Sequence, residues 1–90
     1  MSKQYALITG ATSGIGLEIS KSLALRGFSL VLVARRQAKL EEVSQRLSSN
    51  YGVDVDFCVG DLEDPQVPQE IYAFCKKKDY FISLLVNNAG

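Results

Sequence analysis

Three glycines near the start of the chain, Gly10, Gly14 and Gly16, have the type and the spacing that could bind phosphate groups. They follow a short apolar run at 5–8 and precede apolar residues at helical spacing, so they fall where a strand passes into a helix. At such a junction, free backbone N–H groups and the positive end of the helix dipole attract the pyrophosphate of a dinucleotide. We therefore expect this turn to bind a nucleotide.

Each part of this turn has its own predicted role. Gly10 permits a tight turn, Gly14 lets the backbone approach the phosphates without an intervening Cβ, and Gly16 lets the helix pack closely against the strand. Between the glycines, Thr12 and Ser13 add hydroxyl donors. The turn lacks the Gly-Lys-Ser/Thr ending of a P-loop, which argues against ATP or GTP hydrolysis.

Two arginines follow the second apolar run, about twenty residues beyond the glycine turn, where dinucleotide-binding folds distinguish NAD from NADP. An NAD site has an acidic residue there, which binds the ribose hydroxyls and would repel a 2′-phosphate. This chain instead has Ala34-Arg35-Arg36. Because a guanidinium offers a fork of donors to a phosphate, we expect Arg35 to be the main ligand of the 2′-phosphate and Arg36 the second. NADP is favoured over NAD; the alternative is an ordinary solvated strand end.

The elements that must position these residues alternate regularly along the chain. Apolar runs at 5–8, 30–33, 53–59 and 81–86 predict strands, and helical stripes separate them. The stripes consist of Ile15, Ile19 and Leu23, then Leu40, Val43 and Leu47, then Val67, Ile71, Phe74 and Cys75. This alternation predicts an α/β fold with a Rossmann-like doubly wound parallel sheet.

The fourth predicted strand begins the second half of such a sheet, beyond the point where the strand order reverses. Its run Leu84-Leu85-Val86 predicts burial on both faces, which requires a fifth strand that the 90 residues do not supply. We therefore expect an incomplete sheet made of the first four strands and their intervening helices. Residues 1–90 would be the N-terminal part of a single NAD(P)-binding Rossmann domain, with the remainder absent from the chain.

The motifs and their order resemble those of the short-chain dehydrogenase/reductase family. The glycine turn reads Thr9-Gly10-x-x-x-Gly14-Ile15-Gly16, Asp61-Leu62 follows the third strand, and Asn87-Asn88-Ala89-Gly90 ends the fourth. The resemblance covers essentially all 90 residues. Some members of the family also have a basic residue inside the glycine turn. Ala11-Thr12-Ser13 has none, which leaves use of both cofactors open.

This resemblance implies cofactor-binding roles for further residues. Ile15 is part of the family's glycine motif, so the resemblance includes it among the cofactor-binding residues. Asp61 would bind the adenine amino group, and the Leu62 backbone would complete the adenine site. Residues Asn87, Ala89 and Gly90 would line the adenosine side of the cleft. For Asp61, and for Asn87 and its neighbour Asn88, the alternative is simple turn formation.

The resemblance also implies the activity. The longer parent protein would be an NADP(H)-dependent oxidoreductase that interconverts a carbonyl and a secondary alcohol by hydride transfer, acts on a small molecule and forms a homo-oligomer. The family's catalytic serine and its Tyr-x-x-x-Lys pair would lie outside these 90 residues. Tyr72-x-x-x-Lys76 matches the string but precedes the Asn-Asn-Ala-Gly segment, so we expect Tyr72 to be a packing residue. The alternative is a genuinely truncated, non-catalytic nucleotide-binding or interaction protein.

The composition narrows the remaining function classes. Ten Lys plus Arg balance ten Asp plus Glu, so neither nucleic acid nor an anionic membrane is favoured as a partner. The absence of histidine excludes a Ser-His or Cys-His nucleophile pair and removes the commonest metal ligand, so no metal is expected. Cys58 and Cys75 are expected to be reduced thiols. With no apolar run of membrane-spanning length and no signal-peptide pattern, a cytoplasmic location is expected.

Overall fold

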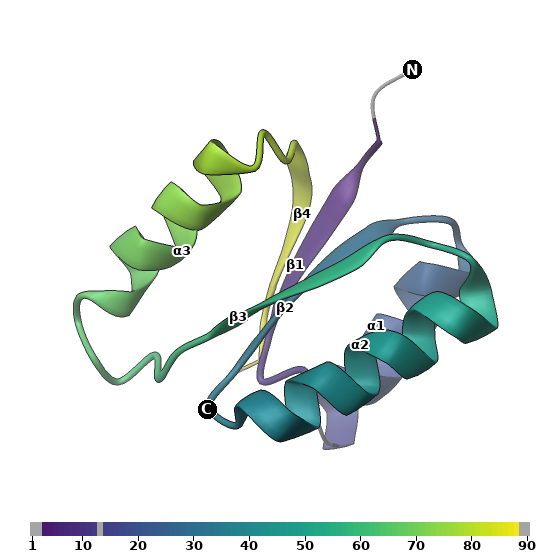
Figure 1. The fold of residues 1–90 in the computed structure, drawn as a ribbon, viewed down its shortest axis with the longest axis horizontal. Helices are drawn as coiled ribbons and strands as arrows, with labels where there is room; N and C mark the ends of the chain where they lie inside the picture. Colours follow the sequence, from purple (N-terminus) through teal and green to yellow (C-terminus); the bar gives the residue numbers. More distant parts are fainter. Residues whose placement is uncertain (1–2, 13, 89–90) are drawn as a thin grey trace.

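The computed structural model describes residues 3–12 and 14–88, and in these ranges strands and helices alternate along the chain (Figure 1). The elements are β1 (Tyr5–Thr9), α1 (Gly14–Leu25), β2 (Ser29–Ala34), α2 (Gln37–Tyr51), β3 (Val55–Val59), α3 (Val67–Lys77) and β4 (Ile82–Asn87). All recorded strand pairs are parallel, and the described strands lie in the order β3-β2-β1-β4. The predicted doubly wound α/β fold is confirmed.

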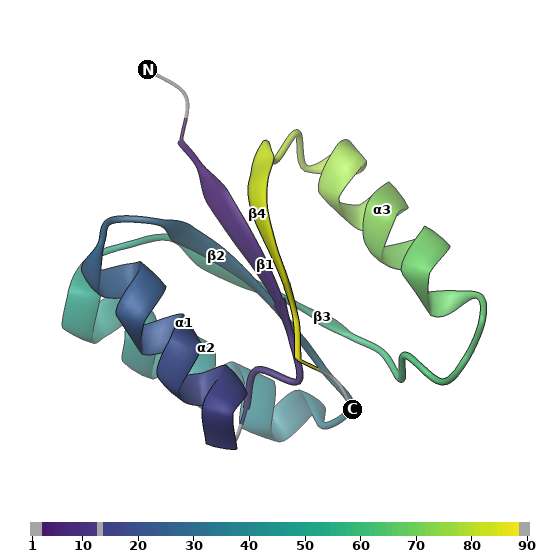
Figure 2. The ribbon, with the colours of Figure 1, turned by 180° about the vertical axis from the view of Figure 1, so that it is seen from behind.

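The helices cover the two faces of this sheet unequally. Figures 1 and 2 show α1 and α2 side by side on one face and α3 on the other. The chain therefore changes face after β3, and it re-enters the sheet on the far side of β1. The strand order reverses between β1 and β4, which is where ligands bind in open sheets of this kind.

Two apolar clusters fill the space between sheet and helices, and β2 contributes to both. Leu30 and Leu32 belong to the cluster under α1 and α2, whereas Val31 and Val33 belong to the cluster under α3. All four are at most 1% exposed. Successive side chains of a strand point to opposite faces, so an unbroken apolar run is what a strand covered on both faces requires.

The predicted stripes of α2 and α3 are confirmed, but two other burial predictions are wrong. Ile15 is 71% exposed because it lies in the first turn of α1, which extends beyond the sheet. Tyr72 is not a packing residue, since it is 67% exposed on the outer side of α3, with the Lys76 ammonium 5.9 Å from its ring centroid. Leu84 and Leu85, whose burial was expected to require a further strand, are exposed on opposite faces of β4.

Two smaller features complete the fold. The third strand begins at Val55 and not at residue 53, although its predicted place at an edge of the sheet is confirmed. Both cysteines are free thiols, as expected.

Among residues 3–12 and 14–88, no helix is both long and apolar enough to cross a membrane.

Candidate nucleotide-binding site

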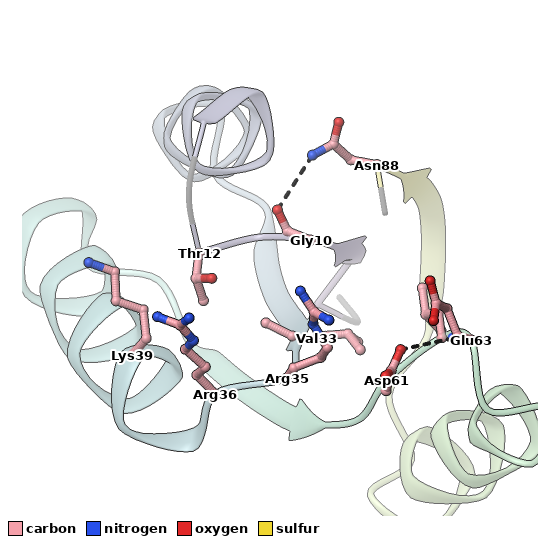
Figure 3. Close-up of a pocket in the computed structure, with 11 residues that line it drawn as sticks. Gly10, Thr12, Val33, Arg35, Arg36, Lys39, Asp61, Glu63 and Asn88 are labelled. Atoms are coloured by element: carbon pink, nitrogen blue, oxygen red, sulfur yellow. Dashed lines mark hydrogen bonds between the residues drawn. The ribbon is translucent and has the colours of Figure 1, made fainter. Parts of the chain in front are cut away.

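A pocket of about 760 Å³ lies at the carboxyl ends of the strands, beside the reversal of strand order (Figure 3). Its walls come from the segments that directly follow β1, β2, β3 and β4, together with the first turn of α2. The lining residues are Gly10, Thr12, Val33, Ala34, Arg35, Arg36, Lys39, Asp61, Leu62, Glu63 and Asn88. Parallel strands bring these segments together because all their carboxyl ends meet at one edge of the sheet.

The glycine turn has a backbone that other residues would strain or obstruct. Gly10 has a φ of 61° and Gly14 a φ of 58°, both in the left-handed region that favours glycine. A Cβ on Gly16 would lie only 2.0 Å from the carbonyl oxygen of Gly10. At Gly14, by contrast, a Cβ would meet nothing within 4 Å. The turn thus packs tightly against the start of α1 on one side and is open on the other.

Hydrogen bonds fix this turn to the end of β4. The backbone N–H of Asn88 donates to the Thr9 hydroxyl oxygen at 2.9 Å, and the Asn88 side-chain amide donates to the Gly10 carbonyl at 3.4 Å. The Thr9 hydroxyl in turn lies 3.2 Å from the side-chain oxygen of Asn87. Asn87 and Asn88 therefore act in the junction between β4 and the turn, and Asn88 also lines the pocket.

Charges of opposite sign line opposite sides of the pocket. In Figure 3, Arg36 and Lys39 lie on one side near Thr12, Asp61 and Glu63 lie on the other, and Arg35 stands between them. None of the ion pairs found among the described residues involves Arg35, Arg36 or Lys39. The Asp61 carboxylate accepts a hydrogen bond from the backbone N–H of Glu63 at 3.0 Å, so its predicted alternative role in a turn is observed at the pocket wall.

The structure brings together about half of the site residues predicted from the sequence. The pocket lining includes Gly10, Thr12, Arg35, Arg36, Asp61 and Leu62. Gly14, Ile15, Gly16 and Asn87 belong to the surrounding turn and strand end without lining it, and Ser13, Ala89 and Gly90 lie outside the described residues.

Sequence reasoning missed Lys39, Glu63 and a direct pocket role for Asn88. For Lys39 a signal was present, because it follows Arg36 by three positions and so shares a helical face with it. Tyr72 and Lys76 do not line the pocket. In residues 3–12 and 14–88, no group of His, Cys, Asp or Glu side chains could hold a metal ion.

Comparison with known proteins places this site in a family. The profile of the family described as "short chain dehydrogenase" matches residues 4–90. Hydroxysteroid dehydrogenase-like protein 1 of Gallus gallus is 40% identical over 89 residues, covering 97% of this chain and 26% of the relative. The chain spans about a quarter of the length of the curated relatives that it matches.

Solved structures agree with the sequence relatives. L-sorbose reductase from Gluconobacter frateurii, complexed with NADPH and L-sorbose, superposes with a TM-score of 0.93 at 36% identity, covering 100% of this chain and 34% of that one. A short-chain dehydrogenase from Sphingobium yanoikuyae in complex with NADPH gives a TM-score of 0.86 at 39% identity, covering 97% and 34%. With its glycine turn, its strand order and a family match over nearly its whole length, the chain belongs to the short-chain dehydrogenase/reductase family of oxidoreductases.

Proposed function

We propose that this chain is the cofactor-binding portion of an NADP(H)-dependent oxidoreductase that interconverts a carbonyl and a secondary alcohol by hydride transfer. The observation that carries the proposal is the position of Arg35 and Arg36, which line the pocket directly after β2, where a carboxylate would favour NAD. The NADPH complexes of the two similar structures support the same cofactor.

The residues present fit the chemical groups of NADP. The open side of the turn at Gly14 leaves room for the backbone to approach the pyrophosphate. Arg35 and Arg36 offer forked donors to the 2′-phosphate, and the Asp61 carboxylate on the opposite side offers an acceptor to the adenine amino group. When bound, the nicotinamide ring would donate or accept the hydride. The protein residues named here would bind and orient the cofactor.

We further propose that the 90 residues are the N-terminal part of a single Rossmann domain in a longer protein. Leu84 and Leu85 in β4, and Phe81 directly before it, expose apolar surface that an additional strand and helix would cover. The coverage of about a third of each similar solved structure supports this arrangement. The catalytic serine, tyrosine and lysine, the small-molecule substrate site and the homo-oligomer contacts would then belong to the longer protein. The cytoplasmic location expected from the sequence remains part of this proposal.

Cofactor choice is tested with Arg35→Ala in the full-length protein, by titrating NADPH and NADH separately. Loss of a charge-assisted hydrogen bond of about 1.5–3 kcal/mol should weaken NADPH binding by roughly 10- to 100-fold, while NADH binding changes less than about twofold. Arg46→Ala is the matched control, because Arg46 lies on the exposed side of α2, paired with Glu42 outside the pocket. Unchanged NADPH affinity in Arg35→Ala would contradict the assignment.

The activity itself is tested by incubating the full-length protein with NADPH and a panel of ketones and aldehydes. Oxidation of NADPH that depends on the carbonyl compound, with an equal yield of alcohol, is the expected result. Tight binding of NADPH without turnover on any carbonyl of the panel, and without oxidation of the matching alcohols by NADP, would favour the alternative, a non-catalytic nucleotide-binding protein.

A further inference from the structure

The amino end of α2 has an unfavourable arrangement of charges. Arg35 precedes the helix, Arg36 is its N-cap residue, and Lys39 lies in the first turn, which contains no acidic residue. The amino end of a helix is the positive pole of its dipole, so anionic side chains stabilise it and cations destabilise it. Arg36 makes no side-chain hydrogen bond that would cap the helix. Helix stability therefore gives no reason for three cations here.

Neighbouring side chains do not neutralise these cations. On the other described surfaces of the same helical layer, Lys21 pairs with Glu18 at 3.2 Å and Arg46 pairs with Glu42 at 2.6 Å. No such ion pair with a described residue is found for Lys39 or for the two arginines. Because all three side chains line one pocket, their common feature is the space that they face.

The position of Lys39 within the pocket is distinct from that of Arg35. In Figure 3, Lys39 and Arg36 extend from the start of α2 on the side of Thr12, and Arg35 stands closer to Gly10 and Val33. The glycine turn contributes the Thr12 hydroxyl to this side but no cation of its own among the described residues. The cations on this side of the pocket, Arg36 and Lys39, thus come from the start of α2, which faces the turn.

We infer that Lys39 is a third cationic ligand of the 2′-phosphate and a determinant of the preference for NADPH over NADH, supplying from α2 the positive charge that the glycine turn lacks. The inference rests on the proposed function and deepens it. Arg35 and Arg36 can offset the charge of a phosphate monoester, and a third cation beside them adds attraction for the phosphate that the uncharged ribose hydroxyl of NADH does not feel. The Lys39 ammonium is a mobile point charge on a flexible stem, which complements the rigid forks of the arginines.

The test is Lys39→Gln in the full-length protein, with NADPH and NADH titrated separately. NADPH binding should weaken by about three- to tenfold with NADH binding unchanged, and Lys39→Arg should retain most of the preference. The thermal midpoint of the cofactor-free Lys39→Gln protein should stay equal or rise, because a cation is removed from the positive end of α2. A role of Lys39 in fold stability would instead lower that midpoint.

Lys77→Gln is the matched control. Lys77 is exposed in the last turn of α3, where a cation is favourable, and it does not line the pocket. This variant should leave both cofactor affinities unchanged. If Lys39→Gln keeps the NADPH preference while Arg35→Ala abolishes it, the inference about Lys39 is wrong and the proposed function stands. If neither substitution alters the preference for NADPH, the inference about Lys39 and the proposed NADP(H) specificity are both wrong. Equal weakening of NADPH and NADH binding in Lys39→Gln would also overturn the specificity role.

Discussion

At the scale of single residues, Gly16 has no room for a side chain. A Cβ there would lie 2.0 Å from the Gly10 carbonyl oxygen and 2.7 Å from the Asn88 side-chain nitrogen. Since the nearest atom belongs to the backbone, Gly16→Ala must displace the start of α1 from the turn. We expect a loss of about 1–3 kcal/mol in the free energy of unfolding, together with weaker NADPH binding, measured by thermal unfolding and cofactor titration.

A second glycine separates the effect on folding from the effect on binding. Gly52 ends α2 with a φ of 67°, and a Cβ there would meet nothing within 4 Å. Gly52→Ala should therefore destabilise the protein by about 1 kcal/mol through backbone strain and leave NADPH affinity unchanged. If Gly16→Ala behaved in the same way, the close contact between α1 and the turn would have no role in binding.

Thr9 gives a second prediction at this scale, because its buried hydroxyl accepts the hydrogen bond from the Asn88 backbone N–H. Thr9→Val keeps the shape and removes this acceptor, which should cost about 1–3 kcal/mol of stability and weaken cofactor binding. Thr9→Ser keeps the hydroxyl and should lose less. The two variants are compared by urea unfolding of the full-length protein, and equal stability of valine and serine at position 9 would argue against the bond.

The two thiols give a prediction about reactivity. Burial raises the pKa of Cys58 and of Cys75, and the nearby carboxylates of Glu70 and Asp56 raise the pKa of Cys58 further. Less thiolate is therefore present at neutral pH than in the unfolded chain. Both cysteines should react with iodoacetamide at pH 7.5 much more slowly in the native protein than in urea. Comparable rates in the two conditions would contradict this picture.

At the scale of elements, the turn between α3 and β4 is fixed to β3 through one tyrosine. The Tyr80 hydroxyl donates to the Asp56 carboxylate at 2.5 Å, and its ring stacks on Tyr5 with centroids 4.2 Å apart. Burial, followed by the hydrogen bond to Asp56, raises the pKa of the Tyr80 phenol well above its usual value. The folded protein thus keeps this proton at pH values where the unfolded chain releases it.

The sign of the pH dependence follows from that shift. The stabilisation is complete below the unfolded tyrosine pKa of about 10 and is lost as the pH rises above it. Tyr80→Phe should therefore lower the free energy of unfolding by about 1 kcal/mol at pH 7, and its difference from the wild type should shrink above about pH 10. Urea unfolding of both proteins at several pH values measures this difference in the free energy of unfolding. A difference that stayed constant above pH 10 would show that the Tyr80 proton is not linked to stability.

The elements were predictable wherever the sequence pattern was unambiguous. The continuous apolar run of β2 and the helical spacing of Leu40, Val43 and Leu47 predicted buried elements correctly. Ile15 was mispredicted because helical spacing says which residues share a face, but not how far a helix extends beyond the sheet. The extent of that overhang is set by the packing of whole elements. Tyr72 was mispredicted although it lies beside the buried stripe of Val67, Ile71 and Cys75 and not on it.

The candidate site was predictable to a similar degree. Arg35 and Asp61 could be placed from the sequence because each lies within two residues of the end of a strand, and all strand ends of a parallel sheet share one edge. Lys39 could have been found from its spacing, because it follows Arg36 by three positions, whereas Glu63 depends on the course of the turn after β3. The course of that turn is a tertiary property, and local sequence patterns carry little information about it.

At the scale of the whole molecule, β4 exposes apolar surface at an edge of the sheet. Phe81 is 61% exposed and Leu85 64%. We predict that the 90-residue polypeptide produced alone will self-associate, and that Leu85→Lys will reduce the association measured by light scattering. Leu25→Lys is the control, because Leu25 is 76% exposed on α1 away from β4. A wild-type fragment that stayed monomeric and unfolded cooperatively would support the alternative of a truncated binding protein.

The hydrogen bond between Thr9 and Asn88 also sets the earliest point in synthesis at which the proposed nucleotide site can be complete. Its partners are separated by 79 positions, which a ribosome adds in roughly 4–16 seconds at about 5–20 residues per second. The three strands β1, β2 and β3 can pair as soon as they leave the ribosome, because their contacts are closer in sequence. The glycine turn receives its β4 partner only after residue 88 has been added. A nascent chain therefore passes through an interval in which the sheet is begun but the nucleotide site is not yet formed.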